Sequence, residues 1–176
     1  MEENQGVRRL SDMGQELLGL LPRLRRFARA LTRHEADADD LVQLAIERAL
    51  QHQAQWQADT SLDRWMYRIV RNAWIDEVRA RRRRGAQLDV DEFADFVPGE
   101  GGDALTDALS VQAAMARLPE EQRTAVSLVL VEGLSYKEAA EVMQVPIGTL
   151  TSRLARGREA LQQLLGGAPG ANHASG

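Results

Sequence analysis

Hydroxyl and guanidinium side chains recur at intervals of three and four residues in the last third of this 176-residue chain. On a helix this spacing places them on one face, and the set is Thr149, Ser152, Arg153 and Arg156. Such side chains have the reach to bind DNA phosphates and base edges in a major groove. The pattern therefore predicts the recognition helix of a DNA-binding unit.

The residues before this face predict the helix-turn-helix that would position it. Ser135 and Glu138 have the spacing of a capping box, and Ala139 and Ala140 leave room for a second helix to cross. Pro146 suits the first turn of that second helix. Its inward stripe is expected to be Ile147, Leu150, Leu154, Leu161 and Leu165. Two plain bundle helices with solvated arginines remain the alternative, although these features occur together at helix-turn-helix spacing.

Composition excludes several kinds of chemistry. The chain has no cysteine, which excludes disulfides and thiolate metal sites. His34, His52 and His173 lie far apart without ligand spacing, so we expect neither metal nor cofactor. No Ser/His/Asp or Cys/His set and no phosphate-binding glycine loop is present, which leaves a helical enzyme as a weak alternative. Apolar runs such as 125–131 are too short to span a membrane and the start resembles no signal peptide, so a cytoplasmic location without membrane insertion is expected.

The N-terminal half predicts a long helix from about 12 to 32, after a frayed start at 1–11. Pro22 is expected to kink this helix or to reset its start. Apolar residues at helical spacing would face the core, namely Leu17, Leu20, Leu21, Leu24, Phe27, Ala28 and Leu31. The arginines are expected on the outside, namely Arg23, Arg25, Arg26, Arg29 and Arg33.

A second helix is expected over 34–52, with Asp37 as its N-cap. The residues expected to face inward are Leu41, Ala45, Ile46, Ala49 and Leu50. The opposite face combines Asp39, Asp40, Gln43 and Glu47. Taken alone, this face is either solvated or a docking patch for a basic partner.

A third helix is expected over 62–84, capped by Thr60 or Ser61. Its buried stripe would be Leu62, Trp65, Met66, Ile69, Ala73 and Val78, and its basic block Arg68, Arg71, Arg79 and 81–84. Arginine interleaved with Trp65, Tyr67 and Trp74 is the composition of a surface that binds phosphates and stacks exposed bases. Aromatics at helical spacing are also frequent in cores. We assign Trp65 to the core and leave Trp74 and Trp56 open.

Charge divides the chain into blocks that the net value of −4 conceals. Residues 1–67 carry a net −2, 68–84 carry +5, 85–110 carry −7 and 111–176 carry 0. Proline and glycine in 85–107 predict a flexible acidic linker, and another helix is expected to begin at Pro119. We therefore predict an all-α fold of two small helical domains, 12–84 and 108–165, joined by the linker 85–107 and followed by a disordered tail, 166–176.

Four passages together resemble the bacterial RNA polymerase sigma factors of the extracytoplasmic function (ECF) type, in the sigma-70 family. They are ADADDLVQLAIERAL, SLDRWMYRIVRNAWIDEVRARRRR, LPEEQRTAV and LSYKEAAEVMQVPIGTLTSRLARGREAL. The last alone is also similar to other helix-turn-helix regulators, but the order of all four and their separation by a linker are specific. The resemblance covers about 16–165 and implies sigma region 2 at the N-terminus and region 4 at the C-terminus.

For region 2 the resemblance implies that the second helix docks on the clamp of the largest subunit of core RNA polymerase. The matching residues are Asp39, Asp40, Gln43 and Glu47, with Leu44 in place of an acidic residue common in the family. It also implies that the loop 53–63, with Trp56, holds an unpaired base of the −10 element. Asn72 matches an asparagine near that single strand, and Arg68, Arg71 and Arg79 are candidates for phosphate contact.

For region 4 the resemblance implies reading of the −35 element. The matching positions are Thr151, Ser152, Ala155 and Arg156, with Thr149, Arg153 and Arg158 nearby. Thr151 and Ala155 depart from the larger residues of relatives, so either the promoter differs or the readout depends more on phosphates and shape. The acidic linker would thread through the polymerase or serve as a plain spacer.

The resemblance thus implies a protein that selects promoters for core polymerase, is not itself an enzyme, and is held inactive by an anti-sigma factor. The alternative is a stand-alone helix-turn-helix regulator, whose N-terminal helices only dimerise or bind a protein. That alternative predicts specific DNA binding without polymerase.

Overall fold

The computed structural model describes residues 2–56, 60–85 and 103–166, and these contain helices and no strand. The predicted all-α fold is therefore confirmed. The helices are α1 (Glu2–Thr32), α2 (Glu35–Gln51), α3 (Leu62–Arg83), α4 (Asp103–Arg117), α5 (Glu120–Val126), α6 (Tyr136–Met143) and α7 (Ile147–Gly166). A short 3-10 helix, η1 (Gln53–Gln55), and a π-helical turn, η2 (Ser127–Val131), complete the set.

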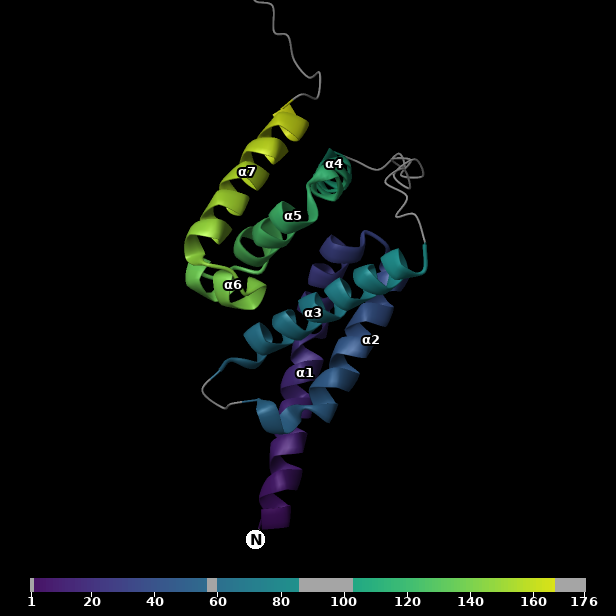
Figure 1. The fold of residues 1–176 in the computed structure, drawn as a ribbon, viewed down its shortest axis with the longest axis vertical. Helices are drawn as coiled ribbons and strands as arrows, with labels where there is room; N and C mark the ends of the chain where they lie inside the picture. Colours follow the sequence, from purple (N-terminus) through teal and green to yellow (C-terminus); the bar gives the residue numbers. More distant parts are fainter. Residues whose placement is uncertain (1, 57–59, 86–102, 167–176) are drawn as a thin grey trace, which may run out of the picture.

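The helices α1, α2 and α3 pack on one another and form the N-terminal unit (Figure 1). Each contributes an apolar stripe at helical spacing, so the three stripes close on a common core. Phe27 of α1 and Tyr67 of α3 lie at its centre, fully buried, with their rings 5.2 Å apart and edge to face. Buried residues around them include Leu24, Leu31, Val42, Ala45, Met66 and Val70.

The N-terminal helix is longer than the sequence indicated. It begins at Glu2, so residues 2–11, which were expected to be frayed, are helical, and it continues through Pro22 without a reset. A proline inside a helix costs about 3 kcal/mol, and the buried Leu17 and Leu24 on its two sides supply packing that offsets this cost. The helix α2 begins at Glu35 after the N-cap His34, so the expectation that Asp37 caps it is wrong; Asp37 lies in the first turn.

Two expectations about apolar and aromatic faces need correction. Leu50 is exposed, so the expectation that it faces inward is wrong. Ile46 is half-buried and packs against the core. Tyr67 and Trp74 are buried and belong to the core, so neither is free to stack on bases. Trp65, assigned to the core, is half-buried and packs against it.

The C-terminal unit holds the helix-turn-helix, formed by α6 and α7. The predicted capping box is confirmed, with Ser135 as N-cap and both bonds to Glu138 present. Gln144 takes a left-handed conformation, φ 55°, that ends α6 and turns the chain through Pro146 into α7. The predicted stripe of α7 holds at Leu150 and Leu154, which are buried, and at Leu161, which is half-buried.

The two ends of the predicted stripe on α7 are exposed. Ile147 is 54% and Leu165 is 39% exposed, because both lie in terminal turns of α7, where fewer neighbours can cover them. The middle of the helix instead packs on α5 through a glycine. A Cβ on Gly157 would lie 2.7 Å from Val126 Cγ2 and 3.3 Å from the Gln122 carbonyl oxygen, so only glycine permits this approach.

The helix α4 begins at Asp103, so the last five residues of the expected linker, 103–107, are helical. Residues 86–102 of that linker and 167–176 of the expected disordered tail lie outside the described residues. The helix expected to begin at Pro119 starts at Glu120 with Pro119 as its N-cap, and it passes into η2 before Gly133.

The close approach at Gly157 generates a test on a single helix. Gly157→Ala should lower the free energy of unfolding by about 1–3 kcal/mol, because the added methyl group overpacks α5 against α7. Gly148→Ala, where a Cβ meets nothing within 4 Å, should be neutral or raise it by up to about 1 kcal/mol. Urea unfolding followed by circular dichroism measures both, and equal stability of the two variants would contradict the contact.

Candidate nucleic-acid interface

The exposed face of α7 carries most of the side chains that the sequence singled out. Thr151, Ser152, Arg156 and Arg158 are exposed, as is Ala155, and Thr149 is half-buried. The Thr151 hydroxyl donates to the Ile147 carbonyl oxygen at 2.8 Å, which leaves its oxygen as an acceptor. The structure thus brings the Thr151 and Ser152 hydroxyls and the Arg156 guanidinium together on one open side of α7, as phosphate and base contacts require. Arg158 lies two residues further on and therefore projects from another side of the helix.

Arg153 belongs to the same predicted set but faces a neighbour. Its side chain is 27% exposed and forms an ion pair with Glu121 of α5. The same carboxylate lies 3.9 Å from Arg71 of α3, whose side chain is only 11% exposed. Burial lowers the pKa of Arg71, and the nearby Glu121 carboxylate opposes this effect. One predicted contact to the −35 element and one to the −10 element therefore share a single carboxylate.

The remaining predicted residues of α3 lie apart from this shared carboxylate. Arg68 and Arg79 are exposed, and Asn72 is half-buried. Trp56, just before α3, is half-buried and packs against Trp65 with ring centroids 6.5 Å apart. Its indole N–H donates to the Thr60 carbonyl oxygen at 3.0 Å, so the ring is held from both sides at the edge of the unit.

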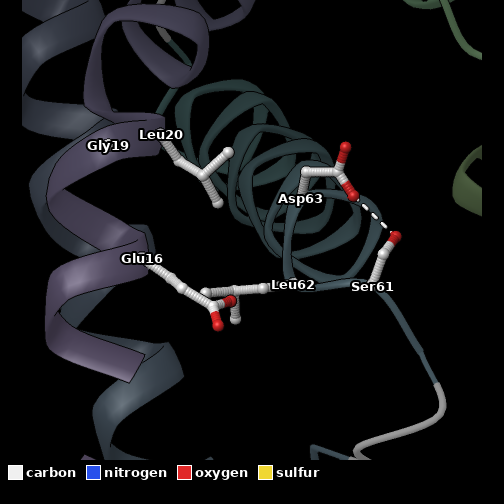
Figure 2. A pocket seen from close by; sticks show the side chains of 6 residues that line it. All are labelled: Glu16, Gly19, Leu20, Ser61, Leu62 and Asp63. Carbon is white, nitrogen blue, oxygen red and sulfur yellow. Dashed lines mark hydrogen bonds between the residues drawn. The ribbon is translucent and has the colours of Figure 1, made fainter. Parts of the chain in front are cut away.

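A shallow hollow of about 340 Å³ lies between α1 and the start of α3 (Figure 2). Ser61 and Asp63, from the end of the predicted base-holding loop, form one side, and Glu16 of α1 forms the other. The Ser61 hydroxyl donates to Asp63 Oδ1 at 2.6 Å. Leu20 and Leu62 supply apolar walls. Two carboxylates disfavour a phosphate here. Asp63 already accepts from Ser61, Arg64 and Arg23, so Glu16 is the carboxylate suited to accept from the amino group of a base.

The predicted docking face on α2 is acidic and open. Asp39, Asp40, Gln43 and Glu47 are all exposed. Arg25 lies 3.4 Å from Asp39, and the Gln43 amide donates to Glu47 at 3.3 Å. Leu44 is half-buried and packs against the core, so it lies beside this face rather than within it.

The sequence did not predict the most buried ionic cluster in the described part of the chain. Glu132, which follows η2, has a side chain with no exposed surface. Arg26 of α1 donates to both its carboxylate oxygens, Nε to Oε1 and Nη2 to Oε2, each at 2.8 Å. The Tyr67 hydroxyl donates to Oε2 at 2.8 Å, and Arg23 Nε lies 3.4 Å from the same oxygen. Arg23 and Arg26, expected to be solvated, therefore join the two units.

The pKa values of Arg26 and Tyr67, which both bind Glu132, are raised. The hydrogen bond to Glu132 raises the pKa of Arg26. Burial, with the Glu132 hydrogen bond as the second cause, raises the pKa of Tyr67 above its ordinary value. Arg26 therefore stays charged and Tyr67 keeps its hydroxyl proton at neutral pH. The only sequence signal for this cluster was a glutamate directly after the apolar run 128–131. Such a local pattern does not predict which distant residues contact it.

A buried arginine also joins the two units. Arg123 of α5 is 1% exposed and donates to the Leu118 carbonyl oxygen at 2.8 Å and the Leu31 carbonyl oxygen at 3.4 Å. These carbonyls follow α4 and close α1, where a cation is favoured by the helix dipole. Burial lowers the pKa of Arg123 to about 10, so it stays charged at neutral pH.

Neither a metal centre nor a membrane span is found in the part of the chain that the structure describes. Its histidines, aspartates and glutamates form no group of three or more that could hold a metal ion. None of its helices is long and apolar enough to cross a bilayer.

The fold and the exposed face of α7 define a helix-turn-helix DNA-binding protein with an additional helical unit before it. Comparison with known families matches 108–161 to the model "Sigma-70, region 4" and 17–71 to "Sigma2 domain of PhyR". The ECF RNA polymerase sigma factor EcfG of Rhodopseudomonas palustris is 35% identical over 150 residues, covering 85% of this chain and 83% of the relative. The RNA polymerase sigma-H factor of Pseudomonas aeruginosa is 39% identical over 147 residues, 75% of each.

Solved structures agree with the sequence relatives. The sigma factor RpoE from Bartonella quintana, determined in complex with the anti-sigma factor NepR, superimposes with a TM-score of 0.75 at 33% identity, over 89% of this chain and 98% of that one. The chain therefore belongs to the ECF RNA polymerase sigma factors.

The capping box of the helix-turn-helix generates a pH prediction. The bond from the Ser135 backbone N–H lowers the pKa of Glu138 in the folded chain. A lowered folded pKa means that the stabilisation is present above the ordinary glutamate pKa and is lost as pH falls. Glu138→Gln should therefore lower the free energy of unfolding by about 0.3–1 kcal/mol at pH 7.

The measurement is urea unfolding of wild type and Glu138→Gln at pH 7 and pH 3, with Glu159→Gln on α7 as the matched control. The difference between wild type and Glu138→Gln should disappear at pH 3. A difference of equal size at both pH values would exclude the ionised carboxylate as its source.

Proposed function

We propose that the chain is an alternative sigma factor that binds core RNA polymerase and directs it to specific promoters. The observation that carries this proposal is the presence of two open surfaces of opposite character on the two units. The exposed face of α7 is basic and hydroxyl-bearing, and the exposed face of α2 is acidic. A protein that only reads DNA needs the first, whereas one that also docks on a partner needs both.

The α7 face is assigned to the −35 element. Arg156 and Arg158 are exposed and charged, so they suit phosphates or guanine edges, and Thr149, Thr151, Ser152 and Arg153 complete the set. The short side chains of Thr151 and Ala155 leave few base-edge contacts. Readout at these positions therefore depends on phosphate geometry and groove shape.

The −10 element is assigned to α3 and the segment before it. Extruding a base costs a few kcal/mol, which a preformed pocket and stacking can offset. The hollow between α1 and α3 supplies acceptors for the base (Figure 2), and Trp56 supplies a ring at the same edge. Arg68, Arg71, Asn72 and Arg79 would then follow the strand on either side.

The acidic face of α2 is assigned to the clamp of the largest polymerase subunit. Asp40 and Glu47 are exposed on this face, and the described structure gives neither carboxylate an ion pair within the chain. They therefore complement a basic partner at no cost in broken ion pairs.

Four further assignments follow from the role. The polymerase forms the phosphodiester bonds, so the chain itself catalyses nothing and needs no cofactor. We assign the chain to the cytoplasm, because the promoter DNA and the polymerase on which it would act are there. By analogy with the relative solved with the anti-sigma factor NepR, an anti-sigma factor holds this chain inactive. The two modules are assigned to 12–84 and 108–165, and the helical residues 2–11 and 103–107 extend the first helix of each.

Run-off transcription tests the proposal directly. Sigma-free core polymerase is incubated with a pool of promoter fragments from the source genome, with and without this protein. Discrete transcripts that appear only with the protein establish the role and give its −35 and −10 sequences. Specific DNA binding without any binding to core polymerase would instead favour the stand-alone regulator.

Arg156→Ala tests the reading of the −35 element. The variant should weaken holoenzyme binding to a promoter found by run-off by about 1–3 kcal/mol if the guanidinium contacts a base. Arg117→Ala, an exposed arginine of α4, is the matched control and should bind like wild type. Titration with fluorescent promoter DNA measures both, and unchanged affinity of Arg156→Ala removes this residue from the reading set.

Asp40→Arg tests the docking face. The reversed charge should repel a basic clamp, so transcription should fall to background while the helical signal in circular dichroism stays at the wild-type level. Asp12→Arg, the same change at an exposed position on α1, is the control. If Asp40→Arg binds core polymerase like Asp12→Arg, the docking face lies elsewhere.

A further inference from the structure

We propose that Glu132 is the centre of an intramolecular latch that holds the free chain in a closed, inactive arrangement, without any partner. The latch is defined by Glu132 of the C-terminal unit with Arg23, Arg26 and Tyr67 of the N-terminal unit. This inference rests on the proposed function, because it concerns access of the same two units to promoter DNA.

The contacts of Glu132 come from the other unit. Both carboxylate oxygens are taken by Arg26 at 2.8 Å, and Oε2 also accepts from the Tyr67 hydroxyl at 2.8 Å. Arg23 adds a bond from Nη2 to the Glu132 backbone oxygen at 3.2 Å. A buried carboxylate is tolerated only with such compensation. The burial of Glu132 therefore depends on the two units being in contact.

The backbone around Glu132 is shaped to present it. The π-helical turn η2 ends with the Glu132 N–H bonded to the Ser127 carbonyl oxygen at 2.9 Å. Gly133 follows with φ +76°, a conformation that side-chain-bearing residues rarely adopt. The Leu134 N–H then bonds to the Leu128 carbonyl oxygen at 3.0 Å. The turn thus directs Glu132 towards α1 and α3.

Weaker contacts extend the closed interface on both sides of the latch. Arg64 of α3 lies 3.8 Å from Glu138 and 3.7 Å from Glu141 of α6. Arg71 and Arg153 meet at Glu121. Figure 1 shows α6 against α3, next to this interface. Glu121 thus pairs with Arg71 and Arg153, two of the residues predicted to contact DNA.

The closed arrangement is incompatible with simultaneous binding of both promoter elements. Positions −35 and −10 are about 25 base pairs apart, which is about 85 Å along B-DNA at 3.4 Å per pair. Arg153, assigned to the first element, and Arg71, assigned to the second, both lie within 4 Å of the same carboxylate. The units must therefore separate before both elements are engaged.

The latch is reversible for a physical reason. A buried ion pair gains little over the same charges in water, because the cost of desolvation offsets the attraction. Opening returns the buried Glu132 carboxylate to solvent, whereas the side chains of Arg23 and Arg26 are already 35% and 52% exposed in the closed arrangement. Docking on polymerase therefore has to supply only the free-energy difference between the closed and the open arrangement. The apparent affinity for polymerase is reduced in proportion to the fraction of chains that are open.

The test compares Glu132→Gln with Glu159→Gln, which removes the same charge from an exposed site on α7. Small-angle X-ray scattering of the free full-length chain measures closure. Wild type and Glu159→Gln should be compact, and the radius of gyration of Glu132→Gln should rise by about a quarter as two bodies separate. The affinity of each variant for core polymerase, measured by fluorescence titration, should be about 3–10-fold higher for Glu132→Gln alone.

Each outcome decides a part of the proposal. An expanded wild type, or a compact Glu132→Gln, would overturn the latch whether or not the chain directs transcription. Expansion without tighter polymerase binding would overturn its inhibitory role while leaving the sigma function intact. If Glu132→Gln loses its helical signal, Tyr67→Phe, which keeps the ring and removes one donor, is scored by the same two measurements.

Discussion

A single buried carboxylate joins the two units of this molecule. Glu132 has no exposed side-chain surface. The groups that compensate its charge lie far from it in the chain, with Arg26 106 residues and Tyr67 65 residues earlier. The buried apolar residues of the two units belong to one continuous cluster, so apolar packing also holds the units together. The ionic contacts at Glu132, with Arg123 at the end of α1, add to this packing.

A protein that must change shape needs units that stay folded while the contacts between them change. Apolar cores of interlocking side chains resist gradual deformation, so each unit stays intact as the pair opens and closes. The exposed ion pairs between them, those of Arg64 with Glu138 and Glu141, exchange readily with water or phosphate. Promoter DNA is a polyanion, so it would compete with Glu121 for Arg71 and Arg153, two arginines that we propose contact it.

The sequence was sufficient for features that depend on neighbours along the chain. The capping box at Ser135 and the turn before Pro146 follow from local hydrogen bonding and fixed dihedral angles, and the helical spacing of Leu24, Phe27 and Leu31 predicted their burial. Sequence reasoning failed where contacts with distant segments determine whether a side chain is buried. Tyr67 was considered for base stacking because it lies among arginines, but the Phe27 ring and Glu132 enclose it. Arg26 was expected in solvent because nothing near it in sequence is its partner.

Arg23 gives one last consequence, because it contacts two sites at once. Its Nη1 lies 3.4 Å from Asp63, which lines the hollow between α1 and α3, and its Nε lies 3.4 Å from Glu132. Anything that draws Asp63 away from this guanidinium also changes how firmly Glu132 is held. Thermodynamic linkage makes the effect mutual: the free energy by which an occupant of the hollow favours opening equals the free energy by which opening favours that occupant.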